Sequence, residues 1–305
     1  MIKNYILSLI LLSSCLQAFA QRHVDRFNVF NPLEKELAGK KQMQWLPGFY
    51  GTGGFGKYTG LKDTDHEWHH RMGVAFEILR WQERNSIAGI TQASFIYDPN
   101  NSINFNPRAI FWEEGLLYTR EYDRFNLQLT YFHRCKHDID NLKTRKQRAT
   151  INASFETRVL FNEWQTFIGQ WRIAPGIDFY TTTYDNREPD QWQDKPLNWE
   201  QMIGAVNLHY LWRKSLNDDF NLFLSGYGKM TAFSKNEESF PARYSDLEQV
   251  RLNGAAFGGI EIQRNANLRI GVRIEHLADT GVPVKPRAST LLSLAVQGMS
   301  LGVFY

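Results

Sequence analysis

The chain has 305 residues, of which 43% are hydrophobic and 22% charged, with a formal net charge of +3. No apolar run approaches the ~20 residues that a spanning helix needs, which excludes a helical membrane protein. The aromatic fraction of 14% argues against intrinsic disorder, and the small charge gives no electrostatic case for nucleic acid as a partner. Abundant aromatic residues with a hydrophilic average (mean hydropathy −0.44) are typical of a transmembrane β-barrel.

The first 20 residues have the features of a secretory signal peptide. Lys3 precedes an apolar run from Tyr5 to Leu12, and the run leads to an A-x-A site that ends at Ala20. A lipoprotein signal leading to a lipidated Cys15 is the alternative. Cleavage after Ala20 would leave Cys135 as the single cysteine, so no intramolecular disulfide is expected.

We therefore predict three regions: a signal peptide over 1–20, a polar periplasmic lead-in over 21–42 and an outer-membrane β-barrel over 43–305. The predicted location is the bacterial outer membrane.

From residue 43 onward the sequence alternates apolar and polar residues, the period expected of β-strands with two different faces. The connections between the strands alternate between short turns and longer polar segments, as in a barrel with tight periplasmic turns and long extracellular loops. A secreted soluble β protein is the alternative. The sequence predicts an all-β, antiparallel, up-and-down transmembrane barrel of about twelve strands, at roughly 43–58, 68–82, 87–97, 107–120, 125–136, 148–160, 165–180, 200–214, 219–232, 249–263, 268–277 and 288–305.

The last predicted strand ends in alternating apolar residues and a terminal aromatic, Met299 to Tyr305. This ending resembles the C-terminal signal of bacterial outer-membrane barrels, which implies the barrel-assembly machinery as a partner. The apolar face of this strand is expected to change near Gln297-Gly298.

Charged residues of both signs fall on the predicted inner face of the barrel. Such a lumen is expected to fill with salt bridges, which disfavours a wide pore and leaves a narrow channel open. One strand fits poorly, because Glu113 and Glu114 are adjacent and one of them should face lipid unless a bulge intervenes or the position lies near the interface. The predicted inner residues are Glu156, Arg158, Arg172, Asp178, His209, Arg213, Lys229, Arg251, Glu261, Arg269, Arg273 and Glu275.

One predicted strand carries a pair of residues that could perform chemistry on its outer face. His133 and Cys135 share the parity of the apolar residues Phe125 to Tyr131, and residues two apart lie on one face of a strand. By the predicted topology the pair lies at the level of the outer leaflet. Gln147, before the next strand, has the parity of the same face.

At these residues the chain resembles outer-membrane phospholipase A and the lipid A 3-O-deacylases, which carry a His-x-Ser motif. The resemblance implies His133 as general base, Cys135 as nucleophile in place of serine, and Gln147 in place of the phospholipase's orienting Asn. His133, His137 and Asp140 also resemble the spacing of an uncharacterised envelope family with a His-x-Ser-Ser-His-x-Gly-Asp pattern. Both resemblances cover about 15 residues.

The hypothesis that follows is a hydrolase of phospholipid or lipid A esters, with outer-membrane lipids and lipopolysaccharide as partners. The alternative is a non-enzymatic barrel, either a narrow channel or a structural or adhesive protein. In that case Cys135 is a small lipid-facing residue and His133 an interfacial one.

Carboxylates and imidazoles also gather in two predicted extracellular loops, and such a set could bind Zn²⁺ or Ca²⁺. Polar loops carry these residues by chance as well, so both interpretations stay open. The candidate ligands are His66, His69, His137, Asp138 and Asp140.

Overall fold

The computed structural model describes residues 43–45, 48–59, 67–82, 84–99, 106–138, 149–185, 201–234, 247–263, 266–277 and 289–301. The predicted signal peptide and lead-in lie outside these residues and stay predictions. The strands are β1 (Gln44–Trp45), β2 (Gly48–Thr59), β3 (Trp68–Trp81), β4 (Asn85–Asp98), β5 (Asn106–Glu121), β6 (Phe125–Asp138), β7 (Ala149–Phe161), β8 (Trp164–Thr166), β9 (Gly169–Asp185), β10 (Gln201–Ser215), β11 (Phe220–Ser234), β12 (Leu247–Gln263), β13 (Ala266–Leu277) and β14 (Ser289–Leu301).

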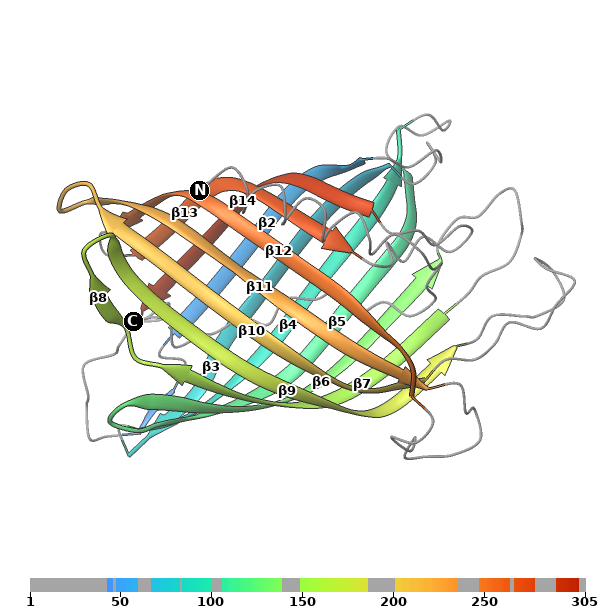
Figure 1. The fold of residues 1–305 in the computed structure, drawn as a ribbon, viewed down its shortest axis with the longest axis horizontal. Coiled ribbons are helices and arrows are strands. Elements are labelled where there is room, and N and C mark those ends of the chain that lie inside the picture. Colours follow the sequence, from blue (N-terminus) through green and yellow to red (C-terminus); the bar gives the residue numbers. More distant parts are fainter. Residues whose placement is uncertain are drawn as a thin grey trace, which may run out of the picture.

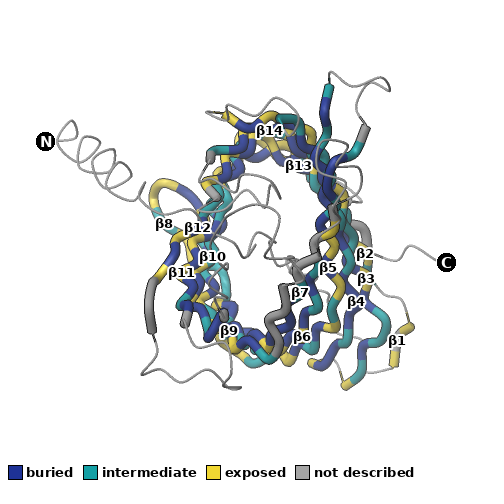
Figure 2. The backbone as a smooth tube through the Cα atoms, turned by 90° about the vertical axis from the view of Figure 1, so that its right-hand side faces the viewer, coloured by how far each residue is buried: buried dark blue, intermediate teal, exposed yellow. Residues whose placement is uncertain are grey.

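Twelve of these strands close into a single barrel. Each pairs antiparallel with its neighbour in sequence, and β14 pairs with β2 to complete the ring (Figures 1 and 2). The short β1 pairs with β3, and the short β8 pairs with the start of β9. Among the described residues no helix is long and apolar enough to cross a membrane. The predicted all-β, up-and-down barrel of twelve strands is confirmed.

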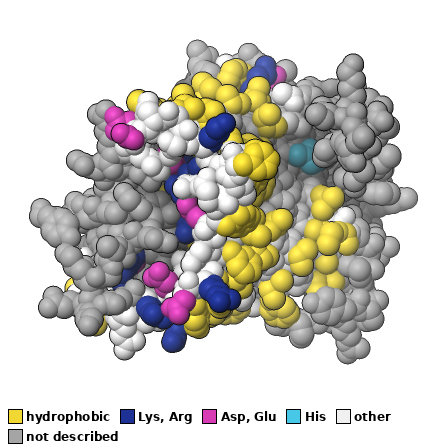
Figure 3. Space-filling model, turned by 60° about the vertical axis from the view of Figure 1, so that its left-hand side comes forward, with side chains coloured by type: hydrophobic (Ala, Val, Ile, Leu, Met, Phe, Trp, Pro, Cys, Tyr) yellow, Lys and Arg dark blue, Asp and Glu magenta, His cyan; other side chains and the backbone are white. Residues whose placement is uncertain are grey.

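The two faces of the wall differ in chemistry because side chains alternate along each strand. In β13 the side chains of Leu268, Ile270 and Val272 are exposed on the outside, and those of Arg269 and Arg273 are buried inside. Figure 3 shows exposed hydrophobic side chains gathered along the outer wall. An apolar exterior around a polar interior is the pattern of barrels that sit in a lipid bilayer.

The lumen is lined both by ion pairs and by clusters of buried apolar side chains, among them Tyr58, Phe111 and Phe132. Of the twelve predicted inner residues, ten are buried, and His209 and Arg213 are partly buried. The predicted salt-bridge network is therefore present: Arg71–Glu275, Arg80–Glu77, Arg108–Asp98, Arg134–Glu113, Arg158–Glu156, Lys229–Asp178 and Arg269–Glu261.

The backbone of the last strand has no irregularity where its apolar face is expected to change. The pairing of β14 with β13 and with β2 runs from Thr290 to Ser300 without a register shift. Leu291 and Ala295 are buried inside, and Leu292 and Leu294 are exposed outside. Met299 and Leu301 have the opposite parity to Leu292 and Leu294, and their side chains lie outside what the structure describes, so the expected change of face stays a prediction.

The connections define two ends of the barrel. Short turns join β3 to β4, β5 to β6 and β10 to β11, and the chain begins the first barrel strand at this end. Longer connections, including 139–148 between β6 and β7, leave from the opposite end. In bacterial barrels the short turns are periplasmic and the long loops extracellular. The last residues of β6 therefore lie at the extracellular end.

Candidate functional site

The outer face of the β5–β6 hairpin carries the candidate site. His133 lies opposite Glu114 and Cys135 lies opposite Trp112, and the register between the two strands has no break. On β6 the even residues from Asn126 to Arg134 are buried in the lumen, so the odd residues point outward. The placement of His133 and Cys135 on one outer face is as the alternation predicts.

The register row between these two pairs is held from inside the barrel by a buried ion pair. Arg134 Nε lies 2.5 Å from Glu113 Oε2, and both side chains are almost fully buried. Gln92 donates to the other Glu113 oxygen at 2.8 Å, and Arg134 donates to Ser154 at 2.9 Å. These contacts tie four consecutive strands, β4 to β7, together directly behind the outer pair.

Outside the barrel, His133 has a carboxylate as its neighbour. Its Nδ1 lies 3.3 Å from Glu114 Oε1, with 39% and 58% of the two side chains exposed. The two atoms are not aligned for a hydrogen bond. Nδ1 is therefore buried without a hydrogen-bond partner among the described residues. The contact is a close electrostatic one, which gains strength when the imidazole is protonated.

Cys135 is a free, partly buried thiol. Its Cα is roughly 6.6 Å from that of His133, the spacing of residues two apart on a strand. On the two adjoining strands Cys135 lies opposite Trp112 of β5 and Ile151 of β7. Glu114 lies within electrostatic range of the thiol. Imidazole, carboxylate and thiol therefore share one small area of the outer wall.

Apolar side chains surround this polar group. Trp112 and Leu116 flank Glu114 along β5, and both are exposed. On the adjoining strands the rings of Tyr131 and Phe155 contact each other with centroids 4.9 Å apart, and both are exposed as well. A carboxylate and an imidazole within an apolar outer band are costly in a bilayer, and ionisable groups at such positions usually have a function.

The sequence did not assign Glu114 to the site. It singled out the Glu113-Glu114 pair as a misfit, and no register shift occurs between β5 and β6 at these residues. A usable signal was present, because the tight turn closed between Tyr122 and Phe125 fixes the hairpin register. Counting back from the pair Glu121–Asn126 brings Glu114 opposite His133. Gln147, the predicted orienting residue, lies outside the described residues.

The predicted metal ligands are only partly described. His69 is buried on the inner face beside Tyr58, and His137 is exposed on the outer face, so these two side chains point to opposite sides of the wall. His66, Asp140 and the side chain of Asp138 lie outside what the structure describes. Among the described residues no group of three or more His, Cys, Asp or Glu could hold a metal ion. A metal site in these loops stays a prediction.

The closed twelve-stranded barrel, its apolar outer wall and its charged lumen define an outer-membrane β-barrel protein. No family model matches the chain, and no curated protein matches it.

Solved outer-membrane barrels are similar in fold at very low identity. LpxR from Salmonella typhimurium matches with 6% identity and a TM-score of 0.47, over 83% of this chain and 99% of that one. The outer-membrane phospholipase A from Escherichia coli matches with 10% identity and a TM-score of 0.44, over 81% and 91% of the two chains. The translocator domain of the autotransporter NalP from Neisseria meningitidis matches with 10% identity and a TM-score of 0.44, over 84% and 88%. Similarity at this level does not assign an activity.

Proposed function

We propose that the protein is a lipid acyl hydrolase of the outer membrane, with Cys135 as nucleophile and His133 as general base. The observation that carries the proposal is the 3.3 Å contact between His133 Nδ1 and Glu114 Oε1 on the outer face, with Cys135 two residues further along the same face. A nucleophile, a base and a carboxylate beside the base are the parts that acyl-transfer sites share.

The position of this group favours a lipid as substrate. Its neighbours Trp112, Leu116 and Phe155 are exposed apolar side chains on the outside of the wall. A molecule that reaches Cys135 from this side must lie within the bilayer, and the extracellular half of the wall meets the outer leaflet. We therefore propose an ester of phospholipid or lipid A as the substrate, with outer-membrane lipid and lipopolysaccharide as the partners.

The proposed reaction has two acyl-transfer steps. His133 takes the thiol proton while the Cys135 sulfur attacks the ester carbonyl, and the C–O bond breaks to give a thioester on Cys135. The departing alcohol, the lysolipid, receives the proton from His133. Water, deprotonated by His133, then attacks the thioester, releasing the fatty acid and returning the proton to the thiol.

Glu114 takes the part of the orienting residue in this proposal. Its carboxylate beside Nδ1 favours the tautomer that leaves Nε2 free to accept a proton, and it stabilises the imidazolium that forms. Glu114 also lies within electrostatic range of the thiol. Its negative charge therefore disfavours a Cys135 thiolate that forms before the sulfur attacks the ester. Proton removal is therefore expected to accompany attack rather than precede it.

The test is fatty-acid release from phospholipid and from lipid A in mixed micelles by the refolded full-length barrel. We expect release by the wild type and none above background for Cys135→Ala or His133→Ala. His276→Ala is the matched control, because His276 is an exposed outer-face histidine on β13, away from the site. Release that is absent from the wild type, or equal in all four proteins, would exclude the hydrolase.

A further inference from the structure

A cavity of about 100 Å³ lies inside the barrel, and its lining is positively charged. The described residues that line it include Arg158, Arg172, Arg273 and His209, and none of these described residues is a carboxylate. One water molecule needs roughly 10–15 Å³ of such space, so the cavity can hold several waters or one small ion. It lies toward the short-turn end of the barrel, away from the outer face of β5 and β6.

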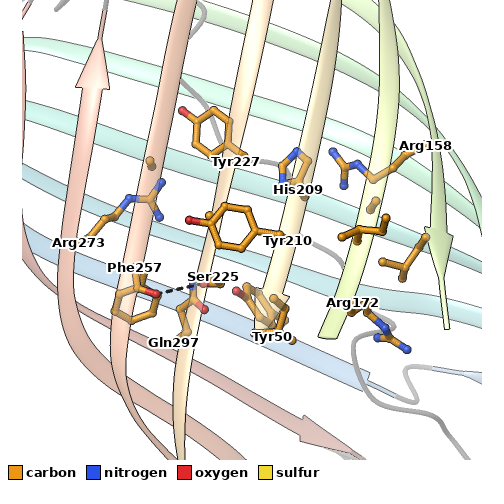
Figure 4. Close-up of a pocket in the computed structure, with 16 residues that line it drawn as sticks. Tyr50, Arg158, Arg172, His209, Tyr210, Ser225, Tyr227, Phe257, Arg273 and Gln297 are labelled. Atoms are coloured by element: carbon orange, nitrogen blue, oxygen red, sulfur yellow. Dashed lines mark hydrogen bonds between the residues drawn. The ribbon is translucent and has the colours of Figure 1, made fainter. Parts of the chain in front are cut away.

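Two guanidinium groups approach this cavity from opposite sides. Arg273 on β13 and Arg158 on β7 both point toward the space beside His209 and Tyr227 (Figure 4). The rings of His209 and Tyr227 stack with centroids 5.5 Å apart. His209 lies within electrostatic range of both arginines. Both arginines therefore lie within electrostatic range of the same imidazole, and all three residues line the cavity.

The described carboxylates nearby do not fully balance the positive charge of these two arginines. Glu275 is shared, with Arg71 Nη2 at 3.1 Å and Arg273 Nε at 3.4 Å from the same oxygen. Two buried arginines thus divide one negative charge. The Arg273 contact does not have hydrogen-bond alignment, and Arg273 Nη2 is buried without a hydrogen-bond partner among the described residues. Among the described residues, one positive charge and at least one donor therefore remain at the β13 side of the cavity.

The β7 side is similar. Arg158 Nη2 lies 2.6 Å from Glu156 Oε1, and the same oxygen accepts a hydrogen bond from Asn207 at 3.0 Å. Arg158 Nε is buried and has no hydrogen-bond partner among the described residues. A buried donor on a charged group is costly unless something accepts its hydrogen bond. Each of the two arginines that line the cavity therefore has a guanidinium donor without a hydrogen-bond partner among the described residues.

We infer that this cavity binds a small oxyanion, a phosphate or a carboxylate, between Arg158 and Arg273. The guanidinium group presents its N–H donors in a planar fork that matches the oxygens of either ligand. A bound anion would compensate the positive charge that Glu275 leaves unbalanced. It would also accept hydrogen bonds from guanidinium N–H groups of the two arginines. This site is independent of the proposed hydrolase, because it lies on the other side of the barrel wall.

The test is isothermal titration calorimetry of the refolded full-length barrel with sodium phosphate and, separately, sodium acetate. Ionic strength is held constant with sodium chloride. We expect saturable binding of at least one of the two anions. Arg273→Gln should weaken it about tenfold or more, the effect of one lost charge-assisted hydrogen bond. Arg80→Gln is the control, because Arg80 is a buried lumen arginine bound to Glu77 outside the cavity.

The two anions also distinguish the ligand class, since binding of phosphate alone or of acetate alone identifies the geometry that the site accepts. Should Arg273→Gln fail to fold, Arg273→Lys replaces it, since Lys keeps the charge but lacks the fork. Lack of saturable binding in the wild type, or equal binding by wild type and the Arg273 variant, would overturn the inference.

Discussion

Glu113 and Glu114 are neighbours in β5, yet each forms its main contact on a different side of the barrel wall. Glu113 is fully buried in the lumen against Arg134, and Glu114 lies on the outer face against His133. Arg134 and His133 are themselves neighbours in β6, so the two contacts are adjacent rungs of one hairpin. The inner contact stabilises the register, set by the turn, that brings the outer pair together.

The outer contact predicts that Glu114→Gln slows hydrolysis. Without the carboxylate, the imidazole loses the group that orients it and stabilises its charged form. We expect kcat to fall about tenfold or more with little change in KM, a smaller effect than the ~10²–10⁴-fold of general acid–base catalysis itself. Steady-state kinetics on micellar substrate measure both. Glu114→Asp should recover part of the rate, and an unchanged kcat in Glu114→Gln would remove Glu114 from the mechanism.

The outward direction of Cys135 predicts where a probe attached to it resides. A nitroxide on Cys135, in protein produced without residues 1–20, should collide more with oxygen than with a water-soluble nickel complex in lipid vesicles. Oxygen concentrates in the bilayer, whereas the nickel complex stays in water. Electron paramagnetic resonance saturation compares the two. The control places the nitroxide at Phe132→Cys in a Cys135→Ser background, because Phe132 is buried on the inner face. If the nitroxide on Cys135 collides more with the nickel complex than with oxygen, the outward orientation of Cys135 is contradicted.

The inner contact predicts a large loss of stability when one partner is removed. Arg134→Leu leaves Glu113 buried without its guanidinium partner, with Gln92 as the remaining neighbour that donates to it. The free energy of unfolding should fall by about 3–5 kcal/mol. Urea unfolding in lipid vesicles, followed by tryptophan fluorescence, gives this value.

The matched double variant Glu113→Leu with Arg134→Leu should recover most of that loss, since no buried charge remains unpaired. If the single variant is as stable as the wild type, the pair does not hold the hairpin.

The turn between β8 and β9 predicts a position that accepts only glycine. Gly169 has φ of +141°, and a Cβ there would lie 2.3 Å from the backbone oxygen of Arg213. Gly169→Ala should lower the free energy of unfolding by about 1–3 kcal/mol, the usual cost of such backbone strain. Gly228→Ala is the control, because a Cβ at Gly228 meets nothing within 4 Å. Equal stability of the two variants in vesicle unfolding would show that the turn adapts.

The barrel could be predicted from sequence because its two faces follow from alternation, which is a local property. Ion pairs between strands are not local, and they follow only from the register. The sequence identified one of Glu113 and Glu114 as misplaced, but it could not say which one, or give its partner, without pairing the hairpin. Likewise it placed Arg273 and Glu275 in the lumen but not Arg71, which comes from β3 to share the carboxylate.

Local departures from regular strands were also missed. The predicted strand over 165–180 begins at Gly169 in the structure, because Trp164–Thr166 forms a separate strand that folds back onto it. The predicted strand over 43–58 comprises β1 and β2, which pair with different parts of β3. Alternation detects the extended backbone in both places but not the points where pairing is interrupted.

The central claim is that Cys135 carries an acyl group during turnover, and intact-protein mass spectrometry tests it most directly. Full-length protein is mixed with phospholipid or lipid A and quenched in acid within the first turnovers. We predict a mass increase of one acyl chain, located on the peptide that contains Cys135 and removed by neutral hydroxylamine, as expected of a thioester. The adduct should be absent from Cys135→Ala. Fatty-acid release by the wild type with no acyl group on Cys135, or release that persists in Cys135→Ala, would contradict the account.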